Sequence, residues 1–381
     1  MKKFLALILA LVLVLGLVAC GEKPAEAPAE APAEAAPAEA VSMKVAMITD
    51  YGDITDQSFN QTTYEACKSY CEANGVDFNY FKPVSDSDAD RIAMIETAID
   101  GGFNVIVMPG YAFGNAIKAT VGTYPDVTFI GLDVSAGDLG EDFQVPANLY
   151  CAVYQEELCG YMAGYAAAKL GYKKLGFLGG MAVPAVVRYG YGFVQGVDAA
   201  AAELGASDVT LNYAYGNQFY GDADITAAMD TWYQDGVEVV FACGGGIFTS
   251  AAEAAAKVGG KVIGVDVDQS GIIDSTYGAG MSVTSAMKGL AATVNTILSK
   301  IQAGQFEGGK IDNLGLVSEN PEENYVQIPA TTQFGEGFTA EDYAALVASM
   351  FKGEVTVSND ITASAADFAK TIAVNDMGNL K

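Results

Sequence analysis

Short apolar runs alternate with longer amphipathic stretches from Met43 onward. Near-continuous apolar runs separated by helices are typical of parallel strands covered on both faces. The expected strands are 45–49, 78–82, 105–108, 128–132, 149–154, 174–178, 209–215, 239–242, 262–265 and 278–284. The expected helices are 57–73, 88–100, 113–123, 156–170, 185–204, 222–235, 248–258 and 285–302. The pattern therefore predicts an α/β protein built from repeated strand–helix units.

The number of strands favours two sheets over one. The chain has 381 residues, 51% of them hydrophobic, which is enough for two cores of ordinary size. By analogy with two-lobed folds, we expect the chain to return to the first lobe and so to form a hinge of several strands, which permits closure around a ligand. The expected lobes are 43–154 plus 279–311 and 155–278 plus 312–381. A single large doubly wound domain is the alternative.

The first 42 residues have a different character. Lys2 and Lys3 precede an apolar run, the pattern of a secretory signal at residues 1–19, with an uncleaved anchor as the alternative. The residues that end at Cys20 resemble a bacterial lipobox, which implies a lipidated Cys20. Residues 20–42 repeat Pro, Ala and Glu and predict an extended tether. We therefore expect a lipid-anchored protein on the extracytoplasmic face of the cell membrane.

Charge and composition exclude several function classes. The net charge of −27 leaves no basic surface for nucleic acid. The sequence contains no histidine, which excludes Ser-His-Asp and Cys-His catalysis and the usual His-containing zinc sites. We expect no catalytic residue, no metal and no cofactor.

A polar turn follows the first expected strand and forms one candidate wall of a ligand site. Asp50, Asp56 and Asn60 crowd this turn together with Phe59. In an open α/β sheet, ligands bind outside the carboxyl ends of the strands, which is where this turn lies. The carboxylates and the amide can hydrogen-bond a ligand, although Asp56 could equally cap the following helix.

Residues far along the chain form the candidate second wall. Tyr111 and Phe248 each follow an expected strand, as Phe59 does, and could stack on a flat ligand. Gly245 lies in a glycine turn that lets backbone approach a ligand. Asp266 can accept from two adjacent hydroxyl groups, and Lys288, expected at the start of a helix, can donate to them. The alternatives are core aromatics, an ordinary turn and a surface lysine.

Six segments keep the order and spacing of a known family. They are TDYGDITDQSFNQ (49–61), YQEELCGYMAGY (154–165), GFLGG (176–180), FACGGG (241–246), GVDVDQ (264–269) and SAMK (285–288). Together they resemble the basic membrane protein family, the nucleoside-binding lipoproteins of bacterial ABC importers. The resemblance runs from about residue 44 to 302. The chain departs from the family at Thr55, where Asn is usual, and at 246–248, where the glycine turn more often continues with Thr-Gly or Ser-Gly.

The resemblance implies a type I periplasmic-binding-protein fold, with two doubly wound parallel-sheet lobes and a multi-strand hinge. It also implies a monomer that captures a nucleoside, by expectation a purine nucleoside, between the lobes and delivers it to ABC permease and ATPase subunits. The expected ligand contacts are Asp50, Asp56, Phe59, Asn60, Tyr111, Gly245, Phe248, Asp266 and Lys288. Two alternatives stay open at this point: a binding protein for a sugar or polyol, and an exported Ser-Lys hydrolase centred on Ser285.

Overall fold

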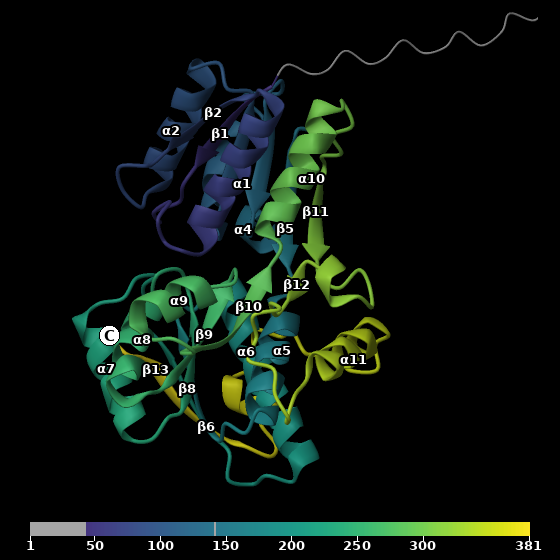
Figure 1. Cartoon of the computed structure of the whole chain (residues 1–381). Helices are drawn as coiled ribbons and strands as arrows, with labels where there is room; N and C mark the ends of the chain where they lie inside the picture. The colour runs from purple at the N-terminus through teal and green to yellow at the C-terminus, as the bar shows by residue number, and fades with distance from the viewer. Residues whose placement is uncertain (1–42, 141) are drawn as a thin grey trace, which may run out of the picture. The chain divides into compact units, whose positions relative to one another are not determined.

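The computed structural model describes residues 43–140 and 142–381. The expected signal peptide, Cys20 and the tether lie outside the described residues. Two parallel sheets with helices on both faces form the two lobes (Figure 1). The prediction of a two-lobed, doubly wound α/β fold is confirmed, and the single-domain alternative is wrong.

The first lobe contains a sheet of order β11-β5-β4-β3-β1-β2, all of it parallel. Its strands are β1 (Lys44–Ile48), β2 (Asp77–Phe81), β3 (Val105–Pro109), β4 (Thr128–Leu132), β5 (Leu149–Tyr154) and β11 (Lys310–Leu314). Its helices are α1 (Phe59–Asn74), α2 (Asp88–Asp100), α3 (Gly114–Thr120), α4 (Ala136–Leu139) and α10 (Leu290–Gln302), with a short 3₁₀ turn η1 (Tyr111–Phe113). All five residues of the central strand β3 are buried, as a strand covered on both faces requires.

The second lobe contains a sheet of order β12-β10-β9-β8-β6-β7-β13, parallel except for the short strand β12. Its strands are β6 (Lys174–Gly179), β7 (Thr210–Tyr215), β8 (Val239–Cys243), β9 (Lys261–Asp266), β10 (Ser282–Lys288), β12 (Val326–Gln327) and β13 (Ala373–Asn379). Its helices are α5 (Glu156–Lys169), α6 (Pro184–Leu204), α7 (Ala223–Gln234), α8 (Phe248–Val258), α9 (Ser270–Tyr277) and α11 (Ala340–Phe351). The 3₁₀ turns η2 (Pro321–Glu323) and η3 (Ala365–Phe368) complete it.

The chain returns to the first lobe later than the sequence suggested. Strand β10 pairs with β9 in the second sheet, so residues 282–288 do not belong to the first lobe. The passage follows at Gly289, and α10 then packs against α1 (Figure 1). Strand β11 pairs with β5 as far as Leu314, so the second return lies beyond residue 311. A sequence pattern can indicate that a strand is buried, but it does not indicate which sheet the strand joins. For this reason the expected lobe boundaries were misplaced.

Helices α5 and α6 pack unusually closely because glycines face the contact. A Cβ atom added at Gly196 would lie 2.1 Å from the backbone oxygen of Tyr161, and one added at Gly160 would lie 2.2 Å from that of Tyr189. Real Cβ atoms do not approach backbone at such distances, so any side chain here must push the helices apart. The contact matters for the site because α5 begins with Glu156 and α6 carries Arg188.

We predict that Gly196→Ala lowers the free energy of unfolding by about 1 to 3 kcal/mol, because the added methyl group overpacks the α5–α6 contact. Urea unfolding of the purified protein measures this. The matched control is Gly271→Ala in α9, where an added Cβ meets nothing within 4 Å. The control should be neutral or stabilising, since alanine favours a helix over glycine. Equal stability of the two variants would contradict this account of the packing.

Candidate functional site

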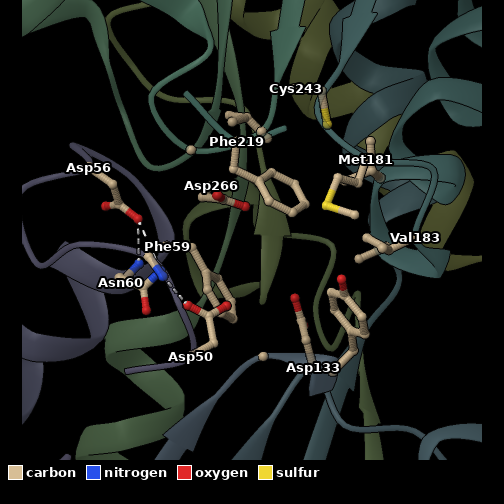
Figure 2. A pocket seen from close by; sticks show the side chains of 18 of the residues that line it. Asp50, Asp56, Phe59, Asn60, Asp133, Met181, Val183, Phe219, Cys243 and Asp266 are labelled. Carbon is tan, nitrogen blue, oxygen red and sulfur yellow. Dashed lines mark hydrogen bonds between the residues drawn. The ribbon is translucent and has the colours of Figure 1, made fainter. Parts of the chain in front are cut away.

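A cavity of about 620 Å³ lies between the carboxyl ends of the two sheets (Figure 2). The first lobe contributes the turn after β1 with the start of α1, and the segments after β3 and β4. The second lobe contributes the segments after β6, β7 and β8 and the ends of β9 and β10. Of the expected contacts, Asp50, Asp56, Phe59, Asn60, Tyr111, Gly245, Asp266 and Lys288 line this cavity. The volume is in the range of sites that bind small molecules.

Asp56 caps α1 and also faces the cavity. Its carboxylate accepts hydrogen bonds from the backbone N–H groups of Ser58, Asn60 and Gln61 at 2.9, 2.9 and 3.0 Å. These are donors that a helix start leaves without partners, so the capping role anticipated as an alternative is present. The Asn60 amide also donates to Asp56, at 3.3 Å, and this bond sets the amide orientation. Its oxygen, Asn60 Oδ1, is buried and has no hydrogen-bond partner among residues 43–140 and 142–381.

Asp50 lies beneath this turn. Its Oδ1 accepts from the backbone N–H groups of Tyr51 and Gly52, both at 2.6 Å. Burial raises the pKa of Asp50 to about 6, although these two hydrogen bonds and Arg91 act to lower it. Asp56 carries the same sign of charge and adds to the rise. Asp50 therefore titrates in the native protein well above the pH at which it titrates in the unfolded chain.

The raised pKa of Asp50 predicts how the free energy of unfolding changes with pH. Between about pH 4 and pH 6 the native state holds a proton on Asp50 that the unfolded state has lost, so stability falls as pH rises through this window. We expect Asp50→Asn to remove about 3 kcal/mol of the difference between the unfolding free energies at about pH 4 and about pH 8. Denaturant titrations at both pH values measure it, with the exposed Asp126→Asn as control. An unchanged pH slope in Asp50→Asn would contradict the burial of this carboxyl.

Lys288 is the centre of a buried ionic network. It ends strand β10 instead of starting a helix, and its side chain is 3% exposed. Its Nζ forms an ion pair with Asp133 and lies 3.5 Å from Glu156 Oε1 and 3.6 Å from Asp266 Oδ1. Burial acts to lower the pKa of Lys288, but the three carboxylates outweigh it and the net shift is upward. Lys288 therefore stays protonated and can donate hydrogen bonds to a ligand. The solvated surface lysine considered as an alternative is wrong.

Asp133 and Asp266 hold unusual backbone conformations at the ends of β4 and β9. Their φ angles are 57° and 65°, in the left-handed region that side chains other than glycine seldom adopt. Such strain is concentrated at functional sites, where it fixes the direction of a side chain. Asp133 Oδ1 is buried and has no partner in the described part of the chain. Asp133 was not among the expected ligand contacts, although it follows an expected strand as Asp50 does.

Aromatic rings border the cavity from both lobes, but they are only partly the expected ones. Phe59 lies at the cavity wall (Figure 2). Lys288 Nζ is 4.7 Å from the centroid of its ring. Tyr51 and Phe219, neither of them anticipated, approach from opposite lobes with centroids 6.2 Å apart. Phe248 is not a lining residue: it starts α8 and is buried in the core beneath the second sheet, 2% exposed. The reason is that α8 turns its first residue inward, so this aromatic is a core residue.

Direct bonds link the two lobes across the cavity. The Ser58 hydroxyl donates to Asp266 Oδ2 at 2.5 Å, and the Gln269 amide donates to the backbone oxygen of Gln57 at 3.0 Å. The Tyr51 hydroxyl contacts Met181 Sδ at 3.5 Å. Each pair joins a first-lobe residue to a second-lobe residue, so the structure represents a closed arrangement.

The hydrolase alternative centred on Ser285 is wrong. Ser285 is fully buried on β10 and does not line the cavity. Its Oγ accepts a hydrogen bond from the backbone N–H of Gln269 at 3.1 Å. A substrate cannot reach this hydroxyl, and Lys288 is committed to carboxylates instead of acting as a base.

The described residues contain no group of three or more His, Cys, Asp or Glu side chains that could hold a metal ion. Within residues 43–140 and 142–381, no helix combines the length and apolarity needed to cross a bilayer.

Comparison with known proteins agrees with this geometry. Residues 43–333 match the Bmp family, described as ABC transporter substrate-binding protein PnrA-like. The ABC transporter nucleoside-binding protein BmpA of Lactococcus lactis is 29% identical over 286 residues, covering 71% of this chain and 78% of that protein. Basic membrane protein A of Borreliella burgdorferi is 28% identical over 280 residues, covering 72% and 76%.

Solved structures show the same fold at lower identity. A solute-binding protein of an ABC transporter system from Aeropyrum pernix K1 superposes with a TM-score of 0.65 at 23% identity, covering 86% of this chain and 90% of that one. The arabinose-binding protein AraP of Geobacillus stearothermophilus gives a TM-score of 0.52 at 15% identity, covering 68% and 86%. The family match spans most of the chain, including both lobes and the cavity between them. The chain therefore belongs to the PnrA-like family of ABC transporter substrate-binding proteins, a family of binding proteins and not of enzymes.

Proposed function

We propose that the protein binds a nucleoside, by preference a purine nucleoside, in the cavity between its lobes. The observation that carries this proposal is a pair of buried acceptors in the cavity wall, Asn60 Oδ1 and Asp133 Oδ1, that have no partner among the described residues. A buried polar atom without a partner costs free energy, so a ligand with matching donors is favoured. A nucleoside has such donors on both its base and its sugar.

The two groups of polar residues suit the two halves of a nucleoside. Asn60, beside Asp50, can meet N–H groups at the edge of a base, while Phe59 and Phe219 offer ring faces for stacking (Figure 2). Asp133 and Asp266 can accept from ribose hydroxyls, and Lys288 can donate to ribose oxygens. The name of the Lactococcus lactis relative, a nucleoside-binding protein, supports the same ligand class.

The remaining parts of the proposal follow from the family and the N-terminal sequence. The protein works as a monomer, is anchored to the cell membrane by lipid on Cys20, and faces the extracytoplasmic side. It delivers its ligand to an ABC permease and ATPase. Lobe closure around the ligand is the mechanism, because groups from both lobes must meet the ligand together.

Isothermal titration of the purified protein with adenosine, guanosine, inosine and uridine tests the proposal. We expect micromolar or tighter binding of at least one purine nucleoside. Phe59→Ala should weaken that binding by about 1 to 3 kcal/mol, the usual contribution of one stacked base. The control is Phe351→Ala, a half-exposed aromatic on α11 that does not line the cavity. If none of the four nucleosides binds and a sugar or polyol does, the proposal is wrong and the ligand belongs to the alternative class.

A further inference from the structure

The ligand cavity has one end whose side chains carry no charge. Tyr51, Tyr111, Met181 and Val183 line it, and we call these four residues the apolar end. The Tyr51 hydroxyl group lies 3.5 Å from Met181 Sδ and 3.3 Å from the Tyr111 hydroxyl group, so three of the four side chains contact one another. Figure 2 shows Met181 and Val183 extending into the cavity. The contacts proposed above for the base and the ribose use none of these side chains.

The order of the strands places the apolar end away from the hinge. The chain crosses between the lobes after β5, β10 and β11. In the first sheet, β3 and β1 precede Tyr111 and Tyr51, and both lie farther from β5 than does β4, which precedes Asp133. In the second sheet, β6 precedes Met181 and lies farther from β10 than does β9, which ends at Asp266. The ionic network is therefore on the hinge side of the cavity, and the apolar end is on its outer side.

The hydrogen-bonding groups of the apolar end already have partners. The Tyr51 and Tyr111 hydroxyl groups bond to each other, and the Tyr51 hydroxyl group also reaches the Met181 sulfur. Burial raises the pKa of both tyrosines, so neither carries a charge at neutral pH. Helix α6 begins with Pro184, which has no N–H group, and its cap residue is Val183, whose side chain is a hydrocarbon. Side chains at this end therefore offer a ligand mainly carbon and sulfur surface.

The stereochemistry of ribose determines which part of a nucleoside reaches this end. The 2′ and 3′ hydroxyl groups lie on one face of the sugar ring, whereas the base and the 5′ carbon lie on the other. With the two hydroxyl groups at Asp133, Asp266 and Lys288, as proposed above, the base and the 5′ carbon point away from the hinge. Asn60 and Asp50 meet the edge of the base, so the 5′ carbon is the part that extends toward the apolar end.

We propose that the apolar end binds an uncharged, apolar substituent on the 5′ carbon of the nucleoside, such as an alkylthio group. This rests on the proposed nucleoside binding and narrows the ligand class to 5′-alkylthio nucleosides. A thioether sulfur packs favourably against aromatic rings, which Tyr51 and Tyr111 supply. The alkyl group loses contact with water against Met181 and Val183. A 5′ hydroxyl group gains less, because the tyrosine hydroxyl groups are already bonded.

Isothermal titration of the purified protein compares three ligands with the same base: the purine nucleoside that the protein binds, its 5′-deoxy derivative and its 5′-deoxy-5′-methylthio derivative. We expect the methylthio derivative to bind about tenfold more tightly than the parent nucleoside, because it buries one more methyl group and a sulfur beside aromatic rings. The 5′-deoxy derivative separates the loss of the hydroxyl group from the gain of the methylthio group. The proposal is overturned if the methylthio derivative binds no more tightly than either of the other two ligands.

Met181→Gln tests whether the apolar end carries this preference. Glutamine keeps the length of the side chain but places a polar amide where the sulfur and the methyl group were. The preference for the methylthio derivative over the parent nucleoside should fall to about twofold or less. The matched control is Met377→Gln, a half-exposed methionine on β13 that does not line the cavity, and it should keep the full preference. A preference that survives Met181→Gln would overturn the assignment to the apolar end.

The parent nucleoside in each titration distinguishes this role of the apolar end from nucleoside binding itself. If no purine nucleoside binds, the proposed function is wrong and the apolar end has no 5′ substituent to recognise. If the parent nucleoside binds and the methylthio derivative has no advantage, the protein binds nucleosides but the apolar end does not select a 5′ substituent. The comparison of ligands on the unaltered protein does not depend on any variant that folds.

Discussion

Lys288→Met is expected to eliminate measurable ligand binding and to lower the free energy of unfolding by about 3 to 5 kcal/mol. The ammonium group of Lys288 is the cation that Asp133, Glu156 and Asp266 share in the buried network. Methionine keeps much of the side-chain volume but leaves these carboxylates buried without it. Removing one partner of a buried ion pair is far more damaging than removing an exposed one, because the remaining charges stay desolvated.

Urea unfolding and calorimetric titration of the same preparations measure both effects. The matched control is Lys300→Met, which breaks an exposed ion pair with Glu307 and should cost less than about 1 kcal/mol. A Lys288→Met protein with the stability and ligand affinity of the control would show that the network neither supports the hinge nor contacts the ligand.

Nucleoside 5′-monophosphates should bind at least about a hundredfold more weakly than the matching nucleoside, since like-charge contacts cost several kcal/mol. The cavity is lined by many carboxylates: Asp50, Asp53, Asp56, Asp133, Asp138 and Asp266. Its two cationic side chains, Lys288 and Arg188, are already paired with acids. A phosphate carries close to two negative charges at neutral pH, and the excess of carboxylates in the cavity would repel it.

Competition titrations with inosine, inosine 5′-monophosphate and 5′-O-methylinosine measure this discrimination. The methyl ether adds bulk at the same position without charge, so it separates electrostatic rejection from steric rejection. If the monophosphate bound as well as inosine, the charged groups of the cavity would not face the 5′ end of the ligand. If both derivatives failed equally, size and not charge would account for the selectivity.

Much of the fold could be predicted from the sequence, because many buried strands and helices have a recognisable pattern of apolar residues. Strand β4 (Thr128–Leu132) and helix α2 (Asp88–Asp100) have the bounds that the apolar pattern indicated. The assignment of β10 to a sheet could not be predicted, because its mixed sequence of Ser, Val, Thr, Ser, Ala, Met and Lys does not indicate which strands it pairs with. Strand partners depend on long-range packing, which a local pattern does not contain.

The sequence predicted those residues of the candidate site that are polar and come soon after the carboxyl end of a strand. Asp50, Asn60 and Asp266 lie there and line the cavity. The same rule, applied evenly, would have indicated Asp133 after β4 and Phe219 after β7. The rule fails at Phe248, which follows a strand but is buried in the core. Whether an aromatic side chain faces inward or outward depends on the first turn of its helix, and the sequence does not give that direction.

The buried network behind the cavity could not be read from the sequence. Glu156 and Arg188 are 32 positions apart and meet because α5 and α6 pack closely through glycines. The resemblance to a known family marked the Glu-rich start of α5 but not its partner. Charges that pair across helices become visible only once the helices are packed.

Mass spectrometry of the small molecule released on denaturing the freshly purified protein identifies the class of ligand without a choice of test compounds. We expect a nucleoside, in an amount approaching one per chain, that rebinds to the cavity and is lost in Lys288→Met. A sugar or polyol released in the same proportion would contradict it, because the ligand class would then be the alternative one.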